Sequence, residues 1–367
     1  MSVDIPLSVK YRPKKLSDVI GQPVVVQAFT NAFKNKTLHH AYILAGNFGS
    51  GKTTVARIVA AMENCENGPT LEPCGKCSNC VEIFSGKSFD VKELDAASNR
   101  GVDDIRKIHE DLYHSPINCR TKYILLDEAH SLTGIAAEAA LKMIEEPPIF
   151  VRFMLATTDA HLLKETIHSR CITWKFNKVG WMEIYNHLIM VADKESLSYE
   201  KDALKIAAQA AFGSVRDSLQ NLQTMMNYAG TDKITVDIAK ESLGVIDRRI
   251  YFDLVETIYN ADISKGYEII NNMLKDGKEA GVILKGVHRH FNNLLTAKVC
   301  TTKVVDLSLS EEEIKKYNFQ ASKFNGEKII KMLSLIKNIA QGLKYNLDPE
   351  FLFNTFYVEC VLEFTKR

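Results

Sequence analysis

The stretch GNFGSGKTT, residues 46–54, constrains the fold more than any other part of the sequence. It follows the apolar run YILA and leads into an amphipathic run that begins at Lys52. In a glycine-rich turn between a strand and a helix, backbone N–H groups point at phosphate oxygens, and the positive end of the helix dipole adds to the attraction. The pattern GxxxxGK[ST] in this context predicts a phosphate-binding loop in an α/β domain.

The side chains of this loop have separate expected roles. Lys52 should reach the β- and γ-phosphates of a nucleotide, and Thr53 should place its hydroxyl on Mg²⁺. A turn that merely packs against its neighbours is the alternative, and the flanking strand and helix make it the weaker one. The loop residues expected to bind the nucleotide are Gly46, Asn47, Phe48, Gly49, Ser50, Gly51, Lys52, Thr53 and Thr54.

A second run, YILLDEAH, ends an apolar strand with the acidic pair Asp127 and Glu128. Asp127 suits a water-mediated contact to Mg²⁺, and Glu128 suits orienting or deprotonating the attacking water. Such a pair alone is a weak signal, but with the upstream loop it predicts hydrolysis of a nucleoside triphosphate. The letters DEAH also occur in one group of helicases. That alternative needs a second parallel-sheet lobe, which the sequence after residue 178 does not indicate.

The α/β pattern covers only the first half of the chain. Short apolar runs, typical of buried parallel strands, alternate there with helical runs. The strand candidates are residues 41–46, 122–129, 152–158 and 171–176. After residue 178 the apolar spacing is helical throughout. We therefore predict a three-layer α/β domain at 1–178 with a parallel sheet, a small helical domain at 179–243 and an all-α domain at 244–367.

The charges and apolar runs limit where the chain can act. Its 46 Lys and Arg balance 45 Asp and Glu, for a formal net charge of +1, so any contact with nucleic acid must be local. The N-terminus has no apolar signal segment, and eighteen apolar residues never run together, so neither secretion nor membrane insertion is expected. We expect a cytoplasmic protein whose cysteines stay reduced.

Four cysteines, Cys65, Cys74, Cys77 and Cys80, lie within residues 65–80. The last three have CxxCxxC spacing, and the glycines and prolines between them allow tight turns. Four thiolates without an open position describe a structural Zn²⁺ site. An iron–sulfur cluster is the competitor, because CxxCxxC resembles ferredoxin spacing. Zinc is favoured because the further cysteines of typical cluster domains are missing.

Two arginines occupy informative positions. Arg170 follows Ser169 just before the last strand candidate, where an ordinary surface ion pair is the simplest interpretation; in an oligomer it could reach a neighbour's γ-phosphate. Gly213 breaks a helix, and the run from Ser214 to Asp217 predicts a capping box that puts Arg216 in the first turn of the next. A cation is unfavourable there unless an anion lies beside it, so Arg216 is predicted to sense a phosphate. A solvated surface arginine is the alternative, and the residues alone leave it open.

An ordered set of motifs across nearly the whole chain resembles one family. The motifs are KYRPKKLSDVIGQ, HHAYILAGNFGSGKTTVARIVA, the four cysteines, ELDAASNRGVDDIR, ILLDEAHSL, ALKMIEEPP, FMLATTD, IHSRC and GSVRDSL. In this order they look like the gamma/tau subunits of bacterial DNA polymerase III, the ATPase motor of the sliding-clamp loader. The cysteine insert separates this family from replication factor C and from Holliday-junction motors.

The resemblance implies an AAA+ module with ATP, Mg²⁺ and Zn²⁺, a helical lid and a helical collar. On that pattern Thr158 is the first sensor near the γ-phosphate. Arg170 becomes an arginine finger acting in trans, and Arg216 a second sensor acting in cis. The residues that the resemblance assigns to the adenine and ribose region are Tyr11, Arg12, Val19 and Ile20.

The resemblance also implies partners. They are the delta and delta prime subunits and further gamma/tau copies, held through the collar, together with the sliding clamp and primed DNA. Arg100 and Arg106 are candidates for contact with the DNA backbone, unless they belong to a solvated helix face. Longer family members continue into segments that bind the helicase and the polymerase, and this chain stops at Arg367, so we expect it to lack those functions. A non-catalytic assembly subunit that uses ATP only as structural glue is the remaining alternative.

Overall fold

The computed structural model describes residues 5–98, 109–132, 134–300, 309 and 311–365. The chain divides into two compact units, Met1–Thr235 and Val236–Arg367, which we describe separately. The domain boundaries expected at 178 and 243 remain predictions. Among the described residues no helix combines the length and the apolar character needed to cross a bilayer.

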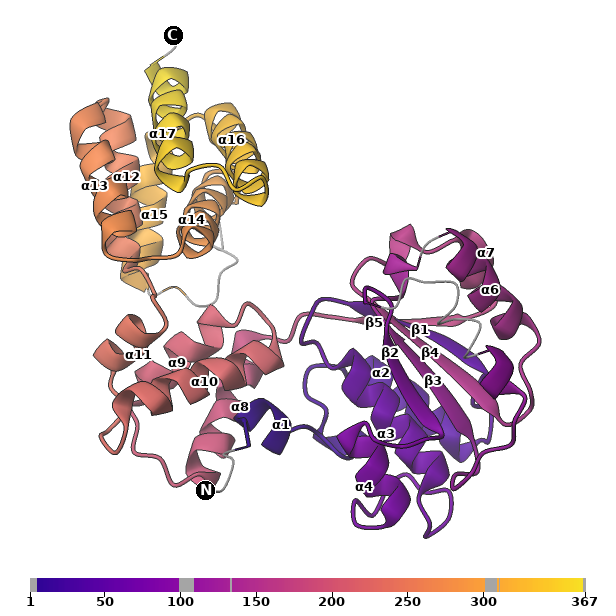
Figure 1. Ribbon diagram of the computed structural model, residues 1–367. Coiled ribbons are helices and arrows are strands. Elements are labelled where there is room, and N and C mark those ends of the chain that lie inside the picture. Colours follow the sequence, from indigo (N-terminus) through magenta and orange to yellow (C-terminus); the bar gives the residue numbers. More distant parts are fainter. Residues whose placement is uncertain (1–4, 99–108, 133, 301–308, 310, 366–367) are drawn as a thin grey trace. The chain divides into compact units, whose positions relative to one another are not determined.

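The first unit contains a five-stranded parallel sheet (Figure 1). Its strand order is β2-β3-β4-β1-β5, and every neighbouring pair is parallel. The strands are β1 (Ala41–Gly46), β2 (Val91–Asp95), β3 (Lys122–Asp127), β4 (Val151–Thr157) and β5 (Ile172–Phe176). Since carboxyl ends of parallel strands share one edge, residues that follow β1, β3 and β4 are brought to the same side of the sheet.

Helices cover both faces of the sheet, as the predicted three layers require. Tyr123 and Leu125 of β3 point to the layer of α2 (Pro23–Lys34) and α3 (Lys52–Asn64). Ile124 and Leu126 point to the opposite layer, which includes α6 (Gly134–Glu145) and α7 (Glu165–His168). This alternation follows from the period of two in a strand. The further short elements of this part are α1 (Leu7–Lys10), η1 (Leu16–Asp18), α4 (Ser78–Ser85), η2 (Ala129–Ser131) and η3 (Ala160–Leu162).

Four of the five strands were predicted, and β2 was missed. Only Val91 in β2 is buried, and its other residues alternate between exposed and half-buried. This is the pattern of a sheet edge, where β2 lies beside β3 alone. A polar edge strand lacks the continuous apolar run by which buried parallel strands are recognised.

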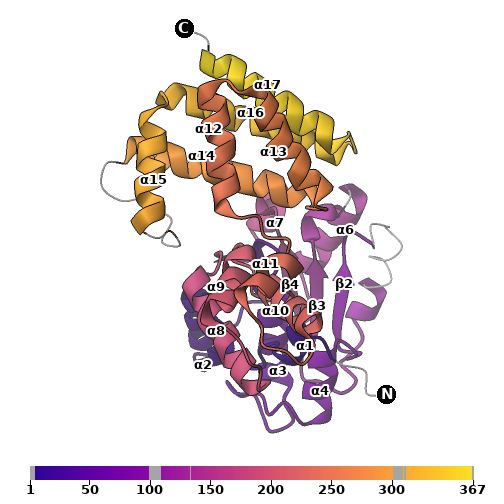
Figure 2. The ribbon, with the colours of Figure 1, turned by 90° about the vertical axis from the view of Figure 1, so that its left-hand side faces the viewer.

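Three helices, α8 (Trp181–Lys194), α9 (Lys201–Ala210) and α10 (Val215–Ala229), complete the first unit and pack together (Figures 1 and 2). The N-terminal helix α1 packs against α10, and the backbone N–H of Leu7 donates to Oε1 of Gln223 at 3.2 Å. The N-terminal segment that the structure describes is therefore bonded to the helical part of the unit through Leu7. Apart from one bridge between Tyr199 and Ile234, the described residues after β5 form no strand, so the second sheet that a helicase would need is not found among them.

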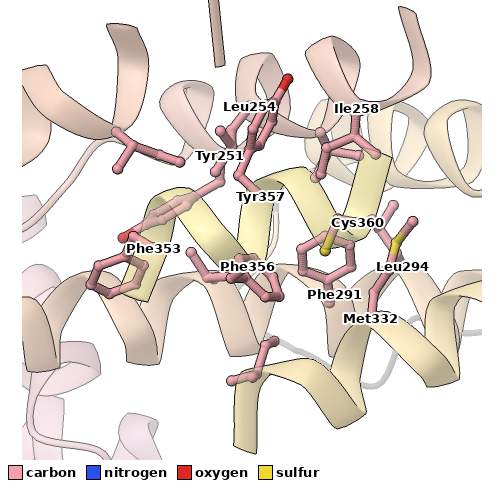
Figure 3. Close-up of a cluster of buried hydrophobic side chains, with 14 of the residues drawn as sticks. Tyr251, Leu254, Ile258, Phe291, Leu294, Met332, Phe353, Phe356, Tyr357 and Cys360 are labelled. Carbon is pink, nitrogen blue, oxygen red and sulfur yellow. The ribbon is translucent and has the colours of Figure 1, made fainter. Parts of the chain in front are cut away.

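The second unit is all helical, as predicted. Its helices are α11 (Val236–Ser242), α12 (Arg248–Asn260), α13 (Ile263–Lys275), α14 (Ala280–Val299), α15 (Glu311–Ser322), α16 (Gly326–Lys344) and α17 (Pro349–Thr365). Figure 3 shows α17 at the centre of the core, with Phe356 near Phe291 of α14 and Tyr357 near Leu254 of α12. The close packing of α13 on α17 depends on Gly266, where a Cβ would lie 1.9 Å from the Tyr357 ring.

Candidate nucleotide site and cysteine cluster

The phosphate loop has the conformation that its glycines predict. Gly49 and Gly51 have φ values of +68° and +100°, which other residues rarely adopt. Nζ of Lys52 donates to the carbonyl oxygens of Gly46 at 2.7 Å and Asn47 at 3.0 Å. Only 5% of Lys52 is exposed, and burial lowers its pKa, an effect that the carboxylates of Glu128 and Asp127 oppose. A buried cation of this kind is ready to pair with an anionic phosphate.

The loop and the acidic pair meet through Thr53. Its Oγ1 donates to Oδ2 of Asp127 at 3.2 Å, although the two residues lie on α3 and at the end of β3. The other oxygen of Asp127, Oδ1, accepts from the backbone N–H of Glu128 at 3.0 Å. A hydroxyl and a carboxylate held side by side are the oxygen ligands that Mg²⁺ prefers, so this pair fits the ion.

Glu128 takes a left-handed backbone conformation with φ of +48°, which is uncommon for a residue with a Cβ. Its Oε2 accepts from the backbone N–H of Thr158 at 3.3 Å and from the Thr158 hydroxyl at 3.1 Å. Nδ1 of His130 lies 3.3 Å from the same oxygen. Thr158, the expected first sensor, therefore lies directly beside the expected catalytic carboxylate.

These groups border a cavity of about 390 Å³. The cavity-lining residues that the sequence predicted are Tyr11, Arg12, Val19, Ile20, Phe48, Gly49, Ser50, Gly51, Lys52, Thr53, Thr54, Asp127, Glu128 and Arg216. Gly46, Asn47 and Thr158 are adjacent to it through the contacts above and do not line it. The lining residues that the sequence reasoning missed are Ser8, Pro13, Asp95, Ala97, Val215 and Leu219. Asp95 ends the unrecognised strand β2, so recognising that strand would have pointed to it.

Arg216 reaches the cavity from the first turn of α10. Ser214 caps this helix, because its Oγ accepts from the backbone N–H of Asp217 at 3.1 Å. The predicted capping box is only half present, since the Ser214 N–H donates to the carbonyl of Ala211. Gly49 lies against this cap so closely that a Cβ there would be 2.0 Å from Oγ of Ser214. The phosphate loop and the N-terminus of α10 are therefore in direct contact.

Arg12 contributes a second guanidinium to the cavity wall. Burial lowers its pKa, and the positive charges of Arg57 and Arg216 lower it further, while Glu93 opposes them. An anion in the cavity would offset this repulsion between the guanidinium groups of half-buried Arg12 and exposed Arg216. Burial also raises the pKa of Tyr11 to about 12, assisted by a short hydrogen bond from its hydroxyl to Glu195.

Arg170 does not line this cavity. Its Nη2 forms an ion pair with Glu145 at the end of α6, and its Nη1 donates to the Thr166 carbonyl at 2.9 Å and to Oγ of Ser169 at 3.0 Å. About a third of the side chain is exposed, and it borders a separate cavity of about 300 Å³. The ordinary surface ion pair is thus present in this chain, and any contact of Arg170 with a nucleotide would have to involve another subunit.

The four clustered cysteines converge as their spacing predicts. The sulfur atoms of Cys65, Cys74, Cys77 and Cys80 all lie within 4.8 Å of one another. Tetrahedral thiolates around Zn²⁺ at ~2.3 Å would be roughly 3.8 Å apart, so the cluster can close on such an ion with small adjustments. Backbone N–H groups of Lys76 and Cys77 donate to the Cys74 sulfur at 3.5 and 3.3 Å and lower the pKa of that thiol. The backbone N–H of Cys80 donates to the Cys77 sulfur at 3.4 Å. The donor set therefore fits a four-thiolate metal ion.

Hydrogen bonds attach the cluster to the α/β core. Nδ2 of Asn79 donates to the carbonyls of Asn64 at 3.0 Å and Asn118 at 3.2 Å. Arg120 donates from Nη1 to the carbonyl of Cys65 at 2.7 Å. None of the four cysteines lines the nucleotide cavity, so the cluster lies outside the nucleotide site. The DNA-contact candidates Arg100 and Arg106 lie outside the described residues.

A sheet of this order, with a phosphate loop after β1 and an acidic pair after β3, identifies a P-loop ATPase of the AAA+ class. Family models match in succession along the chain. They are "DNA polymerase III, delta subunit" over residues 21–180, "DNA polymerase III clamp loader subunit, ATPase lid domain" over 183–222 and "DNA polymerase III subunits gamma and tau domain III" over 234–350.

Curated relatives agree with these matches. DNA polymerase III subunit gamma of Buchnera aphidicola subsp. Schizaphis graminum is 36% identical over 89% of this chain and 90% of its own. Subunit tau of Bacillus subtilis is 31% identical over 95% of this chain and 62% of its own, and subunit tau of Escherichia coli is 37% identical over 76% and 43%. The chain belongs to the gamma/tau family of DNA polymerase III subunits, and is an AAA+ ATPase component of the clamp loader.

Proposed function

We propose that this chain is the motor subunit that binds and hydrolyses ATP so that the loader can open a sliding clamp and place it on primed DNA. The observation that carries the proposal is the convergence of the phosphate loop, the acidic pair and Arg216 of the lid on one cavity. Hydrolysis of ATP would change the negative charge in this cavity. The attraction between Arg216 of the lid and the phosphates held by the loop would change with it. The site is therefore suited to convert nucleotide state into movement.

The residues of the cavity suggest a division of labour. Lys52 would bind the β- and γ-phosphates, while Thr53 and Asp127 would hold Mg²⁺, which neutralises charge on the phosphates when bound. Glu128 would orient and deprotonate the attacking water. Thr158 would report the γ-phosphate. Tyr11, Arg12, Val19 and Ile20 would enclose the base and ribose.

Two arginines would complete the site from different chains. Arg216 would contact the phosphates of its own subunit, which its place on the cavity wall supports. Arg170, outside that cavity, would act on the nucleotide of a neighbouring subunit. For this it must exchange its ion pair with Glu145 for a phosphate. The second, helical unit would hold the delta, delta prime and further gamma/tau subunits together, and the assembly would act at the replisome in the bacterial cytoplasm.

Replacing Glu128 with glutamine tests this proposal in a reconstituted loader. The variant keeps the size of the side chain and loses the base, so we expect ATP binding within about threefold of wild type and turnover reduced at least about a hundredfold. A labelled clamp should then open once on ATP addition and stay on the loader. Glu165→Gln, on an exposed residue of α7, is the control. Repeated clamp loading at the normal rate by the Glu128 variant would contradict the proposal and favour a purely structural use of ATP.

We further propose that the cysteine cluster holds a structural Zn²⁺. Protein purified under reducing conditions should contain about one equivalent of zinc per chain, and Cys77→Ser should remove it and lower the melting temperature by several degrees, since metal binding adds to folding stability. Cys300→Ser is the control, because Cys300 is exposed and outside the cluster. Absence of zinc, or the brown absorption of an iron–sulfur centre, would refute the assignment.

A further inference from the structure

His130 lies next to the expected catalytic carboxylate, and its role is not explained by the motifs above. It is located on η2, directly after the acidic pair, and only 20% of its side chain is exposed. Nδ1 lies 2.9 Å from Oγ1 of Thr157 and 3.3 Å from Oε2 of Glu128. Nε2 lies 4.0 Å from Oδ2 of Asp159. The ring therefore connects the end of β3 to the end of β4.

The neighbours of Nδ1 decide which tautomer the ring adopts. The Glu128 carboxylate is only an acceptor, so a lone pair on Nδ1 would face it unfavourably. With hydrogen on Nδ1, the ring donates its hydrogen bond to Oγ1 of Thr157, and the same N–H lies 3.3 Å from Oε2 of Glu128, where its positive hydrogen attracts the carboxylate. Thr157 also accepts from the backbone N–H of Asp159 at 3.1 Å, which fixes its hydroxyl in this corner. His130 is thus held by β4 and can hold Glu128 in turn.

Thr158 cannot hold Glu128 in the same way throughout the reaction. Its hydroxyl has one hydrogen, and two carboxylates compete for it, Oε2 of Glu128 at 3.1 Å and Oδ2 of Asp159 at 2.8 Å. As the proposed sensor it would also turn to the γ-phosphate. The contact from His130 does not depend on that hydroxyl, so it persists when Thr158 changes partner.

We propose that His130 is the positioning residue for Glu128, fixing Oε2 through Nδ1–H and leaving Oε1 free to accept the proton of the attacking water. No described residue donates a hydrogen bond to Oε1, and Glu128 borders the nucleotide cavity. The inference rests on the proposed role of Glu128 as the base. A carboxylate held by one oxygen keeps its direction and retains a lone pair on the other, which is what a base requires.

Matched variants of His130 test the proposal in the reconstituted loader. His130→Ala should lower kcat at least about tenfold with KM for ATP changed less than about twofold, because orientation and not nucleotide binding is lost. His130→Asn places an amide N–H where Nδ1 lies and should recover kcat to within about threefold of wild type. His130→Gln, whose amide corresponds to Nε2, should stay as slow as the alanine variant. Equal rates for the asparagine and alanine variants would overturn the proposal.

A second background separates this proposal from the role of Glu128 itself. In Glu128→Gln protein, adding His130→Ala should slow turnover by less than about twofold, because the two changes remove the same function. A further tenfold loss would show that His130 acts elsewhere and would overturn the inference alone. If Glu128→Gln keeps normal turnover, the proposed base is wrong and the inference fails with it. Thermal unfolding of each variant identifies loss of fold.

Discussion

Lys52→Ala is expected to abolish ATP turnover, with a loss of at least about a hundredfold and weaker ATP binding by at least about tenfold. Lys52 is the buried cation of the phosphate loop, where two carbonyl oxygens hold it and the charges of Asp127 and Glu128 attract it. Its removal leaves phosphate charge without its main partner in a partly desolvated site. Phosphate release and binding of a fluorescent ATP analogue measure the two effects.

The same variant should remain folded, and this makes the result interpretable. Burial lowers the pKa of Lys52, so the folded chain carries its charged form at a cost in stability below that pKa. Removing the charge should leave the melting temperature unchanged or raise it. Lys34→Ala, on an exposed lysine of α2, is the control and should keep full turnover. Normal turnover by Lys52→Ala would show that this cavity is not the catalytic site.

Arg170→Ala is expected to lower turnover about a thousandfold at each interface that it faces, since arginine fingers contribute at least that much to phosphoryl transfer. ATP affinity of the variant subunit itself should stay within about twofold, because Arg170 lies outside its own cavity. Mixed assemblies with Arg170→Ala on one subunit and Lys52→Ala on another locate the effect. When both changes lie at one interface, ATP turnover should be lost at that interface only. When they lie at different interfaces, turnover should be lost at two.

Lys164→Ala is the matched control for Arg170, because Lys164 also forms an ion pair with a residue of α6, Glu138, and is similarly exposed. It should leave every interface active. A loss of turnover in Arg170→Ala that follows the variant's own nucleotide site, irrespective of its neighbours, would contradict action in trans. Such a result would favour the simpler interpretation, in which Arg170 only forms the surface ion pair with Glu145 of its own chain.

Local sequence patterns predicted the elements that local chemistry specifies. β1, β3, β4 and β5 are strands that buried apolar runs reveal, and Gly213 with Ser214 located the start of α10, and with it Arg216. The cysteine cluster was predicted for the same reason, since its ligands lie close together in the chain. Where the residues that specify a structure lie together in one short segment, the sequence was sufficient to predict that structure.

Contacts between distant segments could not be predicted in this way. The ion pair of Arg170 with Glu145 joins α6 to the end of α7, and nothing in either segment identifies the other. The contact of His130 with Thr157 depends on β3 and β4 being neighbours, which requires the order of strands in the sheet. Asp95 was missed because β2 is a polar edge strand. These features follow from topology, and a single sequence carries no direct measure of it.

The attachment of the N-terminal segment to the helical lid has a consequence for how this family can vary. Lys10 and Tyr11 both bond to Glu195, so this acid has two partners that lie more than 180 positions away in the chain. Loss of the acid would leave the Lys10 ammonium without this partner, and likewise the hydroxyl of Tyr11, a residue that lines the nucleotide cavity. Among relatives, substitutions at position 195 should therefore occur together with substitutions at positions 10 and 11. The sequence of this N-terminal segment should change at the same rate as the sequence of the lid.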